Sequence, residues 1–210
     1  MLPLSPGWPW VTAGLLGAFH GINPAMGWLF AVGLGLQEGR RSAVLAALVP
    51  LALGHAISVG VVILALGAAR PALPAGVVRV GAAVALIGFG VFRLVRPWAH
   101  PRWVGMKVGF RDLTLWSFLM TSAHGAGLML APVVLGTPGS TGDPAGGHHH
   151  ATGAALLGVH SITMFLVMGA IALMVYEILG LELLRRAWIN LDLIWAAALI
   201  LAGVATLWVA

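Results

Sequence analysis

The chain has 210 residues, of which 60% are hydrophobic and only 8% charged, and its mean hydropathy is +1.00. This composition excludes an ordinary soluble domain and predicts an all-α integral membrane protein. The formal net charge of +5 is explained by basic loops at a membrane surface, without any nucleic-acid partner. Because the chain has no cysteine, disulfides and thiolate metal sites are excluded too.

Six apolar stretches are long enough, at roughly 20 residues each, to cross a bilayer as helices. The first has no basic leader region and no small-residue cleavage site, so we expect a retained span rather than a signal peptide. The predicted spans lie approximately at 10–35, 43–67, 76–95, 114–136, 153–177 and 188–208.

The first stretch contains the segment "HGINPAMGW", which is unusual within an apolar helix. Pro24 has no amide hydrogen to donate to the carbonyl of His20, and Gly21 permits local unwinding. The segment therefore predicts a broken helix that offers an imidazole and an unpaired carbonyl, with Asn23 and Met26 nearby. Broken helices bind ions in transporters. A simple proline kink, or a glycine that only serves close helix packing, is the alternative.

Three further histidines follow in later spans: His55, His124 and His160. A charged group near the bilayer centre costs about 2.5–3.5 kcal/mol, so such residues usually face a protein interior or a water-filled cavity. Each histidine could also be a neutral ring bonded to a neighbouring carbonyl. Hydroxyl and thioether side chains share helix faces with these histidines, and they predict a substrate pathway or else ordinary helix packing: Ser58, Ser117, Thr121, Thr163, Met164 and Met168.

The connections indicate how the chain is oriented in the membrane. Nine of the eleven Lys and Arg residues lie in or beside the connections after the first, third and fifth spans. The positive-inside rule then predicts a multi-pass protein of the cell (inner) membrane with both termini outside. Segment 97–113, rich in Trp, Pro and Arg, is expected at the cytoplasmic interface. The outer loop "STGDPAGGHHHATG" contains three consecutive histidines, His148, His149 and His150. They are expected either to capture metal as an accessory site or to be a low-complexity run without a function.

Two halves of the chain resemble each other. "FHG" in the first span matches "AHG" in the fourth, 104 residues later, and "LGHAIS" in the second matches "GVHSIT" in the fifth, 105 residues later. This spacing predicts a duplicated three-helix unit, with repeats at 1–96 and 114–210 around the linker. Because three is odd, the second unit must be inverted, as in secondary transporters whose sites lie near the midplane.

The segment "HGINPAMGW" resembles the first-span pattern H-A-x-x-P-G-H-G of nickel/cobalt efflux permeases, a group within the lysine-exporter superfamily. His20, Pro24 and Gly27 match that pattern in place and spacing, whereas Met26 stands where the pattern has its second histidine. The resemblance implies a six-span fold of two inverted three-helix halves and transport of nickel or cobalt. The same superfamily includes exporters of basic amino acids, and thiol–disulfide electron carriers, whose chemistry this cysteine-free chain cannot perform.

The leading hypothesis is a secondary transporter for a divalent transition-metal cation such as Ni, Co, Zn or Cu, coupled to protons, since imidazole is a ligand for these metals. The expected metal ligands are His20, His55, His124 and His160. One alternative is export of a small organic solute such as a basic amino acid. Another is a membrane electron carrier whose histidines bind haem in pairs. No catalytic motif or nucleotide-binding motif is present, so we expect no enzyme. The glycine content is compatible with a monomer and with a homodimer.

Overall fold

The computed structural model describes residues 7–95, 109–137, 147–179 and 191–208. Within these ranges the chain is helical and has no strand, so the prediction of an all-α fold is confirmed. The elements are α1 (Trp8–Ile22), the 3₁₀ turn η1 (Pro24–Met26), α2 (Trp28–Glu38), α3 (Arg41–Ala72), α4 (Ala75–Val95), α5 (Phe110–Ala123), α6 (Ala126–Met129), α7 (Ala131–Gly136), α8 (Gly147–Met174), the π-helical turn η2 (Val175–Leu179) and α10 (Leu191–Trp208).

Among the described residues, two helices are long and apolar enough to cross a membrane, namely Arg41–Ala69 within α3 and Ala151–Ile178 in α8 and η2. A third candidate span consists of α5 followed by the segment Ala126–Gly136, which is bent by 54° relative to it. Gly76–Phe92 in α4 is a shorter apolar helix. The described part of the chain is therefore compatible with a membrane protein and contains two to three candidate spans by length and composition, and six complete spans remain a prediction.

The first predicted span is interrupted, as the sequence suggested, but by a different arrangement of hydrogen bonds. Helix α1 ends at Ile22, and the amide of Asn23 donates to the carbonyl of His20 over 3.2 Å. The prediction that this carbonyl is left unpaired is therefore wrong, because a tighter turn replaces the bond that Pro24 cannot make. The chain then turns through Gly27, whose φ of +113° favours glycine, into α2.

The fourth predicted span is also broken, which the sequence analysis did not anticipate. Helix α5 ends at Ala123, His124 caps it, and Gly125 adopts a left-handed conformation with φ of +66°. Two short helices, α6 and α7, continue the path. Glycines at 125 and 127 and a proline at 132 are the local signals for this interruption.

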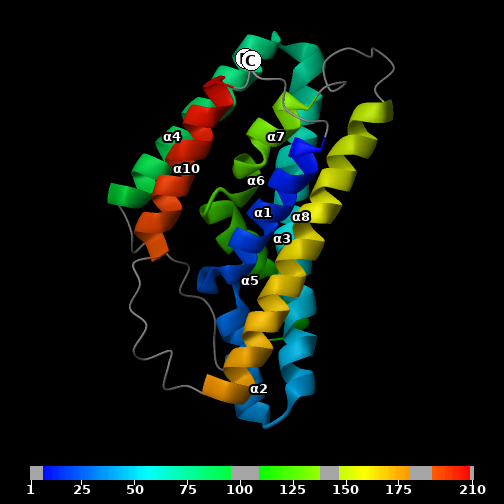
Figure 1. The fold of residues 1–210 in the computed structure, drawn as a ribbon, viewed down its shortest axis with the longest axis vertical. Coiled ribbons are helices and arrows are strands. Elements are labelled where there is room, and N and C mark those ends of the chain that lie inside the picture. The colour runs from blue at the N-terminus through cyan, green and yellow to red at the C-terminus, as the bar shows by residue number, and fades with distance from the viewer. Residues whose placement is uncertain (1–6, 96–108, 138–146, 180–190, 209–210) are drawn as a thin grey trace.

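The helices pack chiefly in three pairs: α1 with α8, α3 with α5, and α4 with α10. Figure 1 shows α8 crossing beside α1 and α3, while α4 and α10 lie together at one side. Glycines permit the close approach in each pair. A Cβ at Gly17 would overlap the His160 carbonyl, one at Gly54 would overlap the Thr114 carbonyl, and one at Gly203 would lie 3.1 Å from the Ala83 carbonyl.

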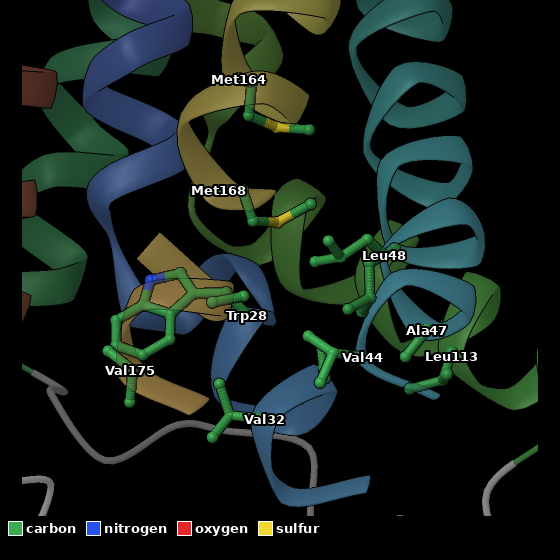
Figure 2. Close-up of a cluster of buried hydrophobic side chains, with 12 residues drawn as sticks. Trp28, Val32, Val44, Ala47, Leu48, Leu113, Met164, Met168 and Val175 are labelled. Atoms are coloured by element: carbon green, nitrogen blue, oxygen red, sulfur yellow. The ribbon is translucent and has the colours of Figure 1, made fainter. Parts of the chain in front are cut away.

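The largest apolar cluster joins α2, α3 and α8. Figure 2 shows Met164 and Met168 of α8 extending toward α3, which carries Leu48, while Trp28 and Val32 of α2 lie farther along the same cluster. By contrast, many large apolar side chains face outward, and Val61, Leu64, Ile162 and Leu166 are more than half exposed. So much outward apolar surface is expected where lipid surrounds the helices.

Candidate functional site

All four predicted ligands are buried in the middle of the helix bundle. His20 lies near the end of α1, His55 lies in the middle of α3, His124 caps α5, and His160 lies in the middle of α8. None is more than 1% exposed. Four buried imidazoles among few other polar groups make this region the main polar interior of the described chain.

Three of the rings are in direct contact although they come from three helices. The ring centroids of His20 and His160 are 4.9 Å apart, those of His20 and His55 are 5.3 Å apart, and those of His55 and His160 are 5.4 Å apart. The His55 and His160 rings are nearly parallel, and their Nε2 atoms are 3.1 Å apart. We call these three residues the histidine cluster.

Hydrogen-bond partners assign the protons in the histidine cluster. The Nδ1 of His160 faces the Ala13 carbonyl at 3.3 Å and must donate to it, so its Nε2 carries a lone pair. His55 then donates from Nε2 to His160, and its Nδ1 accepts the Thr121 hydroxyl proton at 3.2 Å. Because Nδ1 of His20 donates to the Leu16 carbonyl at 2.7 Å, its Nε2 also carries a lone pair.

His124 repeats the local geometry of His20 in the other half of the chain. Its Nδ1 donates to the Met120 carbonyl, four residues back, over 2.7 Å, as His20 does to Leu16. Both histidines lie where the first helix of their half ends. Each ring is thus held in a fixed tautomer by its own helix.

Hydroxyl groups from α5 bind the neighbouring helix α3 at three levels. Ser117 donates to the Leu51 carbonyl over 2.6 Å, Thr121 contacts His55, and Ser122 bonds to Ser58 over 2.9 Å. Ser117, Thr121 and Ser58 were predicted as pathway residues. The hydrogen bonds from Ser117 to Leu51 and between Ser122 and Ser58 also hold α3 and α5 together. Ser122 was not predicted, because it lies beside the stripe of Ser117 and Thr121 rather than on it.

The other predicted pathway residues occupy several different surroundings. The side chain of Asn23 is buried and accepts the Ala25 amide at 2.9 Å, which stabilises the turn that begins with Pro24. Met26 packs in an apolar cluster with residues of α4, α6 and α10, and Met164 packs in the cluster of Figure 2. Thr163 is half-buried on α8. The two methionines are therefore surrounded mainly by hydrocarbon.

The three consecutive histidines at 148–150 were predicted to lie in a loop, and the structure differs from this prediction. The backbone of residues 148–150 forms the beginning of α8 rather than a loop. The side chains of His148, His149 and His150 lie outside what the structure describes, as do Arg185, Arg186 and most of the linker 97–113.

The side chains that are described do not form a ready metal site. No group of three or more His, Cys, Asp or Glu side chains among them has the geometry of a metal centre. The direct contact between the Nε2 atoms of His55 and His160 also leaves no space for a porphyrin between these two rings, so this pair does not fit the predicted haem ligation.

Comparisons with family models, with curated proteins and with solved structures give no match to this chain. Its function must therefore be inferred from its own residues.

Proposed function

We propose that this chain is a multi-pass membrane transporter that carries a divalent transition-metal cation through the histidine cluster. The observation that carries the proposal is the contact of three buried imidazoles from α1, α3 and α8. A structural role for one buried histidine needs only one hydrogen bond, whereas three converging rings bring together three good ligands for Zn, Cu, Ni or Co.

One distance within the cluster is compatible with this choice of cargo. Two imidazole nitrogens on one tetrahedral Zn²⁺, each at 2.0–2.1 Å, are about 3.3 Å apart. The Nε2 atoms of His55 and His160 are 3.1 Å apart, close to that value. The Nε2 of His160 and that of His20 already carry lone pairs. The Nε2 of His55 can become a ligand when the ring proton moves from Nε2 to Nδ1. The Nδ1–H group would then donate a hydrogen bond to the Thr121 hydroxyl oxygen. Binding would also require the His20 ring to turn toward the pair.

Equivalent contacts in the two halves support the proposed inverted repeat of two three-helix units. The relation between the two halves exchanges α1 with α5, α3 with α8, and α4 with α10. The α1–α8 pair therefore corresponds to the α5–α3 pair, whereas the α3–α8 pair and the α4–α10 pair each join two related helices. Gly17 packs against His160, and the related Thr121 contacts the related His55. The matching hydrogen bonds from His20 and His124 to the carbonyls four residues earlier also fit this relation between the halves. Such repeats place transport sites at their interface.

The positions of the helix ends are compatible with the proposed six-span topology in the cell (inner) membrane. Arg41, at the start of α3, pairs over 2.6 Å with Glu177, which lies in η2 directly after α8, so these helix ends lie together. Helices α1 and α10 respectively begin and end at the opposite end of the bundle (Figure 1). With the basic residues inside, both termini would lie outside.

Metal binding to purified protein tests this proposal. Titration calorimetry with Ni²⁺, Co²⁺, Zn²⁺ and Cu²⁺, and with arginine and lysine as competing cargo, should detect a metal and no amino acid. His55→Ala and His160→Ala should each abolish metal binding and metal flux into proteoliposomes. Affinity should also fall as the pH is lowered, because protons compete with the cation for the imidazole lone pairs.

A triple variant with alanine at His148, His149 and His150 is the control, since it removes three imidazoles that do not belong to the histidine cluster. It should retain the high-affinity binding. Unchanged flux of all four metals in monodisperse His55→Ala and His160→Ala proteins would refute the proposal, and binding of arginine alone would replace it with the organic-solute alternative.

A further inference from the structure

A groove of about 320 Å³ lies on the outside of the bundle, where α3 and α5 pack against each other. The lining residues that belong to α5 recur every three or four positions, so they form one face of that helix over about two turns. One further lining residue comes from α3. The six residues are Phe110, Arg111, Thr114, Leu115, Phe118 and Ile57.

The wall of this groove suits a hydrocarbon chain rather than a polar solute. Ile57, Phe110 and Leu115 are exposed, as expected for large apolar side chains that face lipid. The hydroxyl of Thr114 donates to the Phe110 carbonyl of its own helix over 2.9 Å, so it offers its proton to no ligand. A polar solute would lose its hydration in such a groove without gaining hydrogen bonds in return.

One end of the groove carries a positive charge. Arg111, in the first turn of α5, is exposed. The surface that the groove presents is apolar, so Arg111 contributes its methylene stem to the wall and its guanidinium lies at the mouth. Arginines at membrane interfaces adopt this arrangement, with the stem along apolar surface and the charge in the polar layer.

The charge of Arg111 is not neutralised by a carboxylate of the described chain. Arg40 and Arg41, the other described arginines at this end, each form an ion pair, whereas no described carboxylate pairs with Arg111. Asp112, its neighbour in sequence, accepts the Gly109 amide over 2.9 Å and does not line the groove. An anion from outside the chain can therefore complement this guanidinium.

The mouth of the groove lies at the end of the bundle where α3 begins. Leu113, two residues after Arg111, belongs to the apolar cluster that also contains Val44 and Ala47, in the first two turns of α3 (Figure 2). Arg41, which begins α3, is thus at the same end as Arg111. In the proposed orientation this end is cytoplasmic, and the cytoplasmic leaflet is the one that carries anionic lipids.

We propose that the groove between α3 and α5 binds an anionic phospholipid of the cytoplasmic leaflet, with the phosphate at Arg111 and one acyl chain along the apolar wall. A guanidinium can donate two parallel hydrogen bonds to phosphate oxygens. The bound chain would contact both helices whose packing brings Thr121 to His55. Lipid binding goes beyond the proposed transport function and does not depend on the cargo, and the proposed orientation enters only through the choice of leaflet.

Native mass spectrometry of the purified chain in detergent measures this binding directly. Phosphatidylglycerol and phosphatidylcholine with identical acyl chains are titrated separately, and the dissociation constant of the first lipid adduct is compared. Phosphatidylglycerol should bind at least about five-fold more tightly, which is the usual contribution of one basic residue near an anionic membrane surface. Equal affinities for the two lipids would refute the proposal.

Two variants separate the charge from the groove. Arg111→Gln should lower the affinity for phosphatidylglycerol about five-fold. Its matched control is Arg40→Gln, which changes the net charge equally at the same end but does not line the groove, and it should bind normally. Leu115→Trp should also weaken binding, because the larger side chain fills the groove, whereas Leu119→Trp, exposed on the same helix outside the groove, should not.

Every other outcome contradicts the proposed lipid site. Equal losses in Arg111→Gln and Arg40→Gln would show a diffuse attraction to surface charge, and unchanged binding in Leu115→Trp would show that no acyl chain occupies the groove. Displacement of the lipid by an equal concentration of glycerol phosphate would show that the anion alone is recognised. A protein dimer without lipid, lost in both groove variants, would make a second copy of the chain the occupant. Metal binding is measured separately, so the proposed function does not fail with the lipid site.

Discussion

Replacing Gly17 by alanine should weaken the contact between α1 and α8 on which the histidine cluster depends. The added Cβ would overlap the backbone carbonyl of His160, which cannot rotate away as a side chain would. The helices must therefore separate, and overpacking of this kind costs about 1–3 kcal/mol. Gly14→Ala is the matched control, because its Cβ would meet nothing nearer than the Thr163 hydroxyl at 3.9 Å.

Both substitutions gain the same helix propensity, about 1 kcal/mol, so the difference between the two variants isolates the steric cost. We expect Gly17→Ala to have a free energy of unfolding about 1–3 kcal/mol below that of Gly14→Ala. Tryptophan fluorescence during unfolding by sodium dodecyl sulfate in mixed micelles measures it, since the chain has nine tryptophans. Metal affinity should decline in Gly17→Ala alone, because His160 moves with the carbonyl. Equal unfolding free energies in the two variants would show that α1 and α8 do not approach this closely.

Thr121→Val removes the hydroxyl that contacts His55, and it should weaken metal binding about 10–100-fold in calorimetry, as loss of a group that orients a ligand does. Thr114→Val, whose hydroxyl donates only to Phe110 on its own helix, should bind normally, and equal affinities in the two would contradict the role of Thr121. Met168→Leu should change the unfolding free energy by less than about 1.5 kcal/mol and leave metal binding intact, because Met168 packs in hydrocarbon. A loss of metal affinity there would instead make the thioether a ligand. Glu177→Gln should cost at most about 1 kcal/mol in the same unfolding assay, because its ion pair with Arg41 is exposed, and a larger loss would contradict that assignment.

The helical fold and the membrane-compatible helices could be predicted from the sequence. Helix hydrogen bonds are local, and apolar content adds up along a segment, so the stretch 43–67 predicted much of α3 and 153–177 predicted most of α8 with η2. The break near Pro24 was predictable for the same reason, since proline removes one defined hydrogen bond. The hydrogen bond from the Asn23 amide to the His20 carbonyl could not be predicted from the sequence, because it depends on the conformation of the turn.

The candidate residues were chosen from sequence spacing, whereas their contacts depend on the tertiary structure. Repetition at offsets of 104 and 105 residues singled out His20, His55, His124 and His160 without indicating which rings touch. Ser122, which bonds to Ser58, had no periodic signal at all. The sequence thus determined the composition of the helices and their histidines. Only the tertiary structure decided that His20, His55 and His160 meet, because contact between helices depends on their rotation and on glycine-permitted approach, which no local pattern records.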